Sequence, residues 1–190
     1  SQFSQATFVL LAEVVWRYSC SYALKAHIRV AAQLCLWHVR RMAIFHCQVK
    51  VVSRATGRSS VAASAYRSGT SVHNDKEGRT YDFSRRSGVV QADIVIPKGS
   101  GGEWALDRNA LWNAVEAKEK RKDSRVAREF EIALPHELDE EQREELTRRF
   151  AQQLVDRFGT AVDFAIHKPD PRGSEKNHHA HLMMTTRRVG

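Results

Sequence analysis

The chain has 190 residues, of which 42% are hydrophobic, so it can bury one core and fits one domain better than two. This composition excludes a disordered chain. Its longest apolar run, residues 8–16, is interrupted by Glu13 and is too short to cross a bilayer, so no membrane insertion is expected. The formal net charge of +8 favours an anionic partner, with nucleic acid ahead of a membrane surface.

Residues 1–41 differ from the rest in composition. They contain no Met, Gly, Pro, Asp or Asn, and the first methionine is Met42. We therefore expect residues 1–41 to be an upstream-translated or otherwise non-native extension, with a membrane-surface anchor as the alternative because the segment is basic and aromatic, and residues 42–190 to be the native domain. The three cysteines, Cys20, Cys35 and Cys47, are odd in number and lack metal-type spacing. They indicate reduced thiols in a cytoplasmic protein.

The first elements follow Met42. Residues 44–52 alternate apolar and polar side chains, which predicts a strand packed on one face only. Residues 59–68 are small and alanine-rich, with serines for the amino-terminal cap and Gly69 for the stop, which predicts a short helix. Tyr66 lies in its last turn. Residues 70–88 are polar and glycine-punctuated, and we expect a loop.

The middle of the chain continues the pattern. A second strand is predicted over residues 89–96, and Asp107 then begins a helix with apolar residues at Leu111, Trp112 and Val115. Residues 116–128 are dense in charge. They are typical of a solvated helix face, with contact to DNA phosphates as the alternative.

The last third predicts two further strands around a helix. Residues 128–134 alternate, with Glu129 and Glu131 on the face opposite Phe130 and Ile132. Asp139 and Gln142 form a predicted capping box for a helix that ends at Gly159, and residues 160–167 alternate again. We therefore predict an α+β fold with a mainly antiparallel sheet and helices on its apolar face.

Three histidines form the most informative cluster. His179 and His181 flank Ala180, so in a strand they project to the same face. His167 ends the preceding strand, and a short loop allows an antiparallel hairpin to bring all three together. The spacing predicts a facial site of three nitrogen ligands, which His46, Glu129 and Glu131 could join on the open face of the sheet.

Four ordered motifs resemble one known family. They are Met42-Ala-Ile-Phe-His46, Ser64-Ala-Tyr-Arg67, Arg128-Glu-Phe-Glu-Ile-Ala-Leu-Pro135, and Ala165-Ile-His167 with Asn177-His-His-Ala-His-Leu-Met183. From Met42 to Arg187 the chain resembles the MobA/MobL relaxases of conjugative and mobilizable plasmids, most closely the amino-terminal part of TraA-type proteins from agrobacterial and rhizobial plasmids. The resemblance implies the fold of the HUH endonucleases. It also implies a relaxase domain at residues 42–190 that is truncated at the carboxyl end, because domains of this family continue beyond the histidine strand.

The same resemblance makes Tyr66 the nucleophile, and His167, His179 and His181 the metal ligands. A tyrosine hydroxyl has a pKa of about 10, so it needs a base or a nearby cation. A bound metal could orient a scissile phosphate for attack by Tyr66, giving a 5′-phosphotyrosyl enzyme and a free 3′-hydroxyl. Glu129 or Glu131 could act as the base or orient a ligand histidine, and the sequence leaves that choice open.

The expected cofactor and partners follow from the ligand chemistry of the histidines and from the family resemblance. Three imidazoles suit zinc, manganese, nickel or iron, whereas the resemblance implies magnesium or manganese. The expected partners are single-stranded origin-of-transfer DNA, a fused carboxy-terminal helicase region, relaxosome accessory proteins and a type IV secretion coupling protein. Tyr81 and Phe83 are candidates for base stacking. Phosphate contacts are expected from Arg54, Arg58, Arg67, Arg79, Arg85, Arg86, Lys168 and Lys176.

Two other classes of function remain open. A zinc hydrolase could use the three histidines and an activated water, with no role for Tyr66. A non-catalytic DNA-binding module could keep the fold and the basic loops without turnover.

Overall fold

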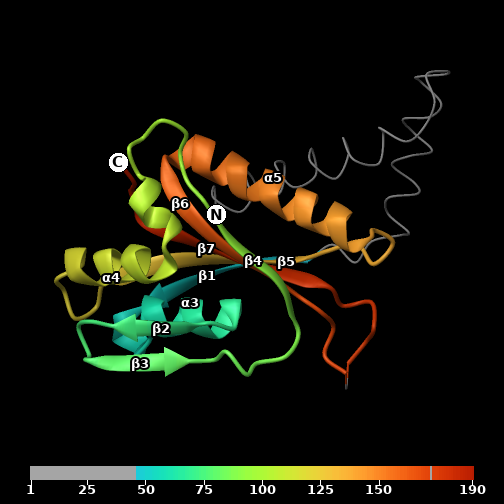
Figure 1. Cartoon of the computed structure of the whole chain (residues 1–190), viewed down its shortest axis with the longest axis horizontal. Coiled ribbons are helices and arrows are strands. Elements are labelled where there is room, and N and C mark those ends of the chain that lie inside the picture. Colours follow the sequence, from blue (N-terminus) through green and yellow to red (C-terminus); the bar gives the residue numbers. More distant parts are fainter. Residues whose placement is uncertain (1–45, 172) are drawn as a thin grey trace.

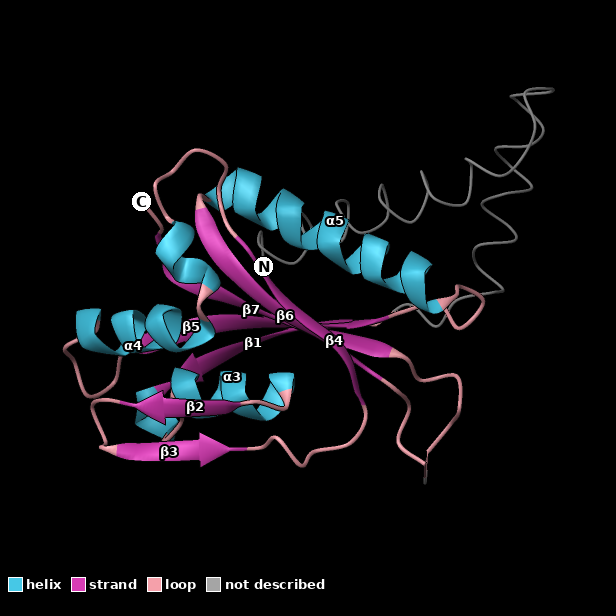
Figure 2. Cartoon of the chain, in the orientation of Figure 1, coloured by secondary structure: helices cyan, strands magenta, loops and turns pink. Residues whose placement is uncertain are grey.

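The computed structural model describes residues 46–171 and 173–190, which form a five-stranded antiparallel sheet, a two-stranded hairpin and three α-helices (Figure 1). The sheet order is β1-β5-β7-β6-β4, so the two histidine-bearing strands are central neighbours. Figure 2 shows the helices in cyan and the strands in magenta. The strands are β1 (Cys47–Ser53), β2 (Ser71–Asn74), β3 (Arg79–Asp82), β4 (Val89–Val95), β5 (Arg125–Ala133), β6 (Thr160–His167) and β7 (His179–Arg188). The helices are η1 (Arg54–Thr56), α3 (Ser60–Ser68), η2 (Glu103–Leu106), α4 (Arg108–Lys118) and α5 (Glu140–Phe158).

Helix α5 covers one face of the sheet. Its predicted capping box is confirmed, because the Asp139 carboxylate accepts from the Gln142 backbone and the Gln142 side chain accepts from the Asp139 backbone. Phe150 lies edge-on to Phe130, with ring centroids 6.1 Å apart, and both rings are fully buried. The main hydrophobic core therefore lies between α5 and the even-numbered residues of β6 and β7.

Helices α3 and α4 cover part of the opposite face, and in Figure 1 the strands pass between α5 and α3. On this face the buried Asp163 carboxylate of β6 accepts hydrogen bonds from Arg108 and from the Trp112 indole at 2.8 Å. The predicted α+β class with an antiparallel sheet is confirmed. The expectation that helices lie on one face only is wrong. The hydrogen bonds from Arg108 and Trp112 to Asp163 hold α4 against the second face, which the alternating sequence pattern predicted to be solvent-exposed.

Two segments differ from their predicted structure. Residues 70–88 contain the β2–β3 hairpin rather than a continuous loop: Val72 is buried on it, and the Asn74 side chain accepts from the amides of Lys76 and Glu77 to close the turn. The charge-dense segment 116–128 is not one solvated helix face. Helix α4 ends at Lys118 and β5 begins at Arg125.

Strand β1 lies at the edge of the sheet. On the face predicted to be buried, Cys47 is partly buried against the core, but Val49 is 43% and Val51 41% exposed, and Val52 on the other face is buried. This part of the prediction is wrong because α5 packs mainly on β4, β6 and β7. Residues 44 and 45 of the predicted strand lie outside the described residues. So do the proposed extension 1–41 and two of the three cysteines.

Among the described residues, Cys47 is a free thiol. Within the described residues, none of the helices has the length and apolar character needed to cross a membrane.

Candidate functional site

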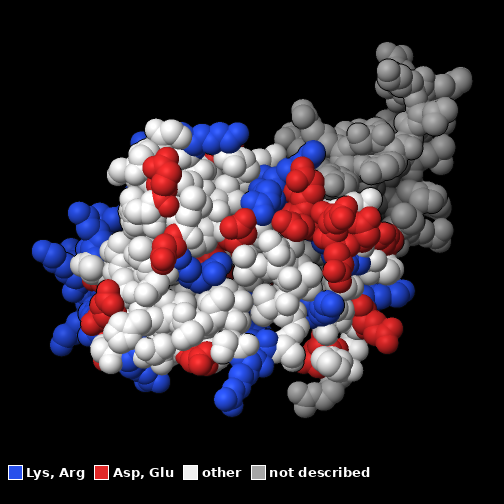
Figure 3. Space-filling model, in the orientation of Figure 1, with Lys and Arg blue, Asp and Glu red and all other residues white. Residues whose placement is uncertain are grey.

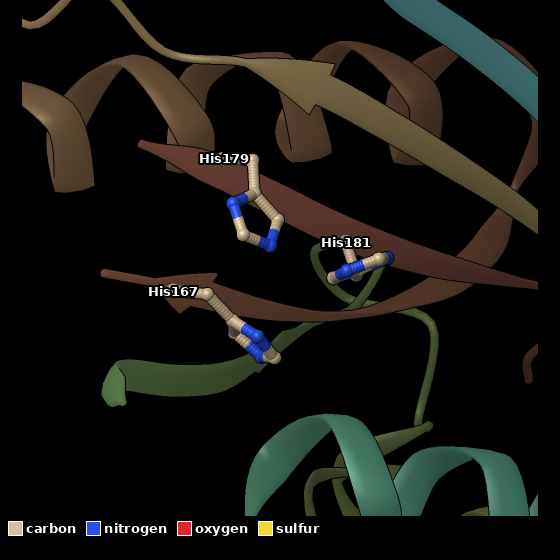
Figure 4. A group of neighbouring side chains, drawn as sticks. All are labelled: His167, His179 and His181. Carbon is tan, nitrogen blue, oxygen red and sulfur yellow. The ribbon is translucent and has the colours of Figure 1, made fainter. Parts of the chain in front are cut away.

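The register of the β6–β7 hairpin brings the three histidines together. His167 is opposite His179, and His181 is opposite Ala165 on the same face. One nitrogen from each ring lies within 4.8 Å of the others, and the ring centroids are 5.1 to 5.3 Å apart (Figure 4). The hairpin closure predicted from the sequence is therefore present.

Each ring has one nitrogen held against an oxygen acceptor. His167 Nε2 is 2.7 Å from the carbonyl of Arg67, and His179 Nδ1 is 3.0 Å from the carbonyl of Asn177. His181 Nδ1 is 2.8 Å from the Glu129 carboxylate. An oxygen acceptor requires a proton on the nitrogen that faces it, so in the neutral ring the other nitrogen is the one that can bind a metal. Three imidazoles oriented in this way fit a divalent metal with positions left open for a substrate.

The electrostatics of His167 support the same protonation state. Its side chain is buried, and burial lowers the pKa of His167 to about 4 against the opposing effect of its hydrogen bond to Arg67. The imidazole is therefore neutral at neutral pH, as a metal ligand must be.

The buried carboxylate of Glu129 orients the His181 ring of this cluster. It is 1% exposed, and it accepts from Arg67 Nε and Nη2, each at 2.5 Å, besides His181. Burial acts to raise the pKa of Glu129, but the hydrogen bonds from His181 and Arg67 outweigh it and lower the pKa to about 2. A fully ionised carboxylate thus fixes both the His181 ring and the Arg67 guanidinium.

Glu131 lies two residues further along β5 and has a different partner. It is opposite His181 in the strand register, but its carboxylate accepts from Lys50 Nζ at 2.5 Å. That hydrogen bond is the largest cause of a lowered pKa of Glu131. His46 precedes β1, and its carbonyl accepts from the Ala133 amide. Among the described residues, the histidine cluster consists of His167, His179 and His181 without His46.

Tyr66 borders the cluster through its neighbour in the chain. Its ring is exposed and lies edge-on to Phe83, with centroids 5.2 Å apart, while the Arg86 guanidinium sits 3.7 Å from the ring centroid. Arg86 also donates to the Tyr66 carbonyl. Since the next carbonyl, that of Arg67, accepts from His167, the end of α3 is tied directly to the histidines.

The expected phosphate-binding residues fall into two groups. Arg54 and Arg67 are engaged inside the protein, Arg54 with the buried Glu116 and Arg67 with Glu129. Their guanidiniums are unavailable to a phosphate unless these contacts break. Arg79 stacks 4.5 Å from the Tyr81 ring centroid, and Lys168 is 3.6 Å from Glu140. The exposed members are Arg58, Arg79, Arg85, Lys168 and Lys176, and Arg86 is partly buried on Tyr66.

Sequence reasoning missed three contributors: the double contact of Arg67, the carbonyl of Asn177, and the pairing of Lys50 with Glu131. One signal was available for Arg67, because a glutamate on a central strand needs a positive partner and Arg67 follows Tyr66 directly. A backbone carbonyl such as that of Asn177 leaves no mark in the sequence.

The fold and the histidine cluster define an α+β protein with a candidate metal centre on one face of an antiparallel sheet. Comparison with known proteins gives the family: the model of the MobA/MobL family matches residues 58–190, so the chain belongs to the MobA/MobL family. The resemblance noted from the four motifs is confirmed.

Relatives and a solved structure agree with this assignment. Mobilization protein MobL of Acidithiobacillus ferridurans is 36% identical over 165 residues, covering 76% of this chain and 43% of that protein. Conjugal transfer protein TraA of Rhizobium radiobacter is 37% identical over 156 residues, covering 77% of this chain and 14% of TraA. A structure described as "Molecular Basis of Vancomycin Resistance Transfer in Staphylococcus aureus" superposes with a TM-score of 0.71 and 38% identity, covering 78% of this chain and 73% of that chain. The chain thus spans less than half the length of these two curated relatives.

Proposed function

We propose that residues 42–190 form a relaxase domain that nicks one strand of plasmid DNA at an origin of transfer. One observation carries the proposal. One nitrogen from each of the three imidazoles lies within 4.8 Å of the others, and the helix that bears Tyr66 is hydrogen-bonded to His167 through the Arg67 carbonyl. The names of the relatives, which refer to mobilization and conjugal transfer, support the same role.

The reaction is a transesterification. The Tyr66 oxygen attacks the phosphorus of the scissile phosphodiester, the bond from phosphorus to the 3′ oxygen breaks, and the 3′ oxygen leaves as a hydroxyl with the proton that Tyr66 gives up. The product is a 5′-phosphotyrosyl linkage that a 3′-hydroxyl can later reverse. A divalent metal on the three histidines, magnesium or manganese with zinc as the alternative, would supply positive charge against the phosphate oxygens.

The surrounding residues hold the reacting groups in place. Glu129 fixes the His181 ring and its tautomer, and Arg67 fixes Glu129. Arg86 and Phe83 hold the Tyr66 ring from two sides. Because both oxygens of Glu129 are occupied, Glu131 is the glutamate left to accept a proton near the site.

DNA and protein partners follow from the assignment. Phosphate contacts come from the exposed arginines and lysines described above, and Tyr81 and Phe83, both partly buried, are the candidates for base stacking. The domain would act in the cytoplasm beside a helicase region, relaxosome accessory proteins and a secretion coupling protein.

A covalent adduct tests the proposal. The 190-residue chain, manganese and a pool of single-stranded oligonucleotides tiling the DNA around its gene should give a denaturation-resistant protein–DNA adduct on a gel. Tyr66→Phe removes the attacking hydroxyl and should bind DNA without forming the adduct, whereas the control Tyr81→Phe should form it. Cleavage by Tyr66→Phe that still requires the histidines would favour a water nucleophile and a zinc hydrolase. DNA binding without any cleavage would favour a non-catalytic module.

A further inference from the structure

A second basic surface lies at the far end of the sheet from the histidines. We name it the α4–β5 ridge, and all of its members are exposed. Figure 3 shows Lys and Arg side chains gathered at the end of the molecule where Figure 1 places the end of α4. The ridge consists of Lys118, Lys120, Arg121, Lys122 and Arg125.

The acids within this segment are largely neutralised. Glu116 is buried against Arg54, and Glu119 pairs with Arg187 at 2.6 Å. Asp123 is the remaining acid between Lys118 and Arg125. In the part of the chain that the structure describes, no carboxylate forms an ion pair with a side chain of the ridge. Five exposed positive charges therefore face solvent; the unpaired carboxylates beside them are Asp123 in the same segment and Asp75, which lines the same pocket as Lys120.

Most of the hydrogen bonds from other elements to the backbone of the ridge come from Arg54. The Arg54 guanidinium donates to the carbonyls of Glu116 at 2.6 Å, Arg121 at 3.2 Å, and Glu119. The Arg54 amide donates to Ser124 at 3.1 Å, and the Ser53 hydroxyl donates to the Asp123 carbonyl at 3.3 Å. A loop held at so many carbonyls loses little further backbone freedom when a ligand binds.

Strand β5 sets the distance between the ridge and the histidine cluster. Arg125 begins β5, and Ala133 at its end pairs with His179. Eight steps of about 3.3 Å separate the two by roughly 26 Å. A rise of about 3.4 Å per base pair makes this about eight base pairs of duplex DNA. The ridge is therefore a separate surface.

The chemistry of the ridge favours nucleic acid over a membrane. Binding to a membrane surface combines positive charge with apolar side chains that enter the lipid. The exposed large hydrophobic residues of the described chain are Val49, Val51, Tyr66, Trp104 and Leu106, and none belongs to the ridge. A fixed row of lysines and arginines without an apolar anchor suits the regularly spaced phosphates of DNA.

We propose that the α4–β5 ridge binds the phosphate backbone of DNA at a point about 26 Å from the phosphodiester held at the histidine cluster. The inference deepens the proposed function, because it assigns a second contact to the same DNA. The contact fixes the position of the DNA and carries no sequence information.

Salt dependence of binding tests the ridge. We compare Lys120→Gln/Lys122→Gln with Lys98→Gln/Arg157→Gln, which removes the same charge from exposed positions outside the ridge. Binding is measured by fluorescence anisotropy with a labelled DNA duplex of about 20 base pairs that carries a single-stranded tail, at several salt concentrations. Each lost phosphate contact lowers the slope of log affinity against log salt by about 1, so the ridge variant should lose about 2 and the control less than about 0.5.

Three outcomes would overturn the inference: equal losses in both variants, no loss in either, or a loss by the ridge variant on vesicles of phosphatidylserine and phosphatidylcholine but not on DNA. Binding needs no attack by Tyr66, so this result is independent of the adduct. If only the ridge variant shows a smaller salt dependence of DNA binding, and the chain never forms the covalent adduct, then the proposal for the ridge stands and the proposed relaxase reaction is refuted.

Discussion

Glu129→Gln is the substitution that most directly tests how the histidine cluster is held. The carboxylate accepts one hydrogen bond from His181 and two from Arg67. Glutamine is almost the same size, but only its single oxygen accepts, and its amide would turn two N–H groups toward partners that are themselves donors. Either His181 or Arg67 must then lose its partner.

The structure sets the size of the effect. A hydrogen bond to a charged group contributes about 1.5 to 3 kcal/mol, and loss of a carboxylate behind a ligand histidine typically weakens metal binding about 10 to 100-fold. A factor of ten equals about 1.4 kcal/mol, so the two figures agree. We expect manganese to bind Glu129→Gln about 10 to 100-fold more weakly than the wild type.

Calorimetric titration with manganese measures this, and Glu131→Gln is the matched control. Glu131 lies on the same face of the same strand, but its carboxylate is bonded to Lys50. The control should therefore keep its affinity within about twofold, since no ligand histidine loses a partner. If Glu129→Gln does not fold, Arg67→Lys replaces it as the test variant, because it keeps a positive charge next to Glu129 but removes the two parallel hydrogen bonds of the guanidinium. Equal affinities for Glu129→Gln and Glu131→Gln would refute the orienting role.

Three further predictions follow from buried charges and from Tyr66. Glu116→Gln breaks a buried ion pair and should cost about 3 kcal/mol, lowering Tm by about 6 to 12 °C. Glu119 pairs with Arg187, whose side chain is exposed, so Glu119→Gln should cost less than about 1 kcal/mol; similar Tm values for the two variants would contradict this. His167 has a pKa lowered by burial from 6.5 to about 4, so metal-free protein should lose up to about 3 kcal/mol in urea unfolding as the pH falls through that window, and His167→Gln should lack this part of the loss. Arg86→Ala should slow adduct formation about fivefold, or about 1 kcal/mol. The control is Arg157→Ala, which removes a guanidinium 5.7 Å from the Phe158 ring and should leave the rate unchanged; equal rates for the two variants would contradict a role of Arg86 in positioning Tyr66.

The histidine hairpin could be predicted from sequence because local rules decide it. Alternation with a period of two places His179 and His181 on one face, and the short connection after His167 leaves an antiparallel return as the simplest path. Helix α5 was equally accessible, since its capping box and its closing glycine lie within the segment itself. These signals involve residues close together in the chain.

Features that depend on distant partners could not be predicted in the same way. An exposed arginine and one paired with a buried glutamate look identical in sequence, and the structure places Arg54 on Glu116 and Arg67 on Glu129. Likewise, the alternation in β1 is that of a half-buried strand, but its position at the sheet edge leaves Val49 open. The sequence gives periodicity, while burial depends on what the rest of the chain packs against each face.

Arg67 shows how the proposed nucleophile and the proposed ligands depend on one another. Its side chain holds Glu129, which orients His181, and its carbonyl accepts from His167. Two of the three histidine rings, His167 and His181, are thus held by hydrogen bonds that depend on Arg67 at the end of α3. Tyr66 is the residue before Arg67. A shift of α3 would therefore move the tyrosine and disturb both rings together. In the proposed reaction, such coupling would keep the Tyr66 oxygen and the histidine cluster in one geometry, and positioning of this kind lowers the barrier of a group transfer.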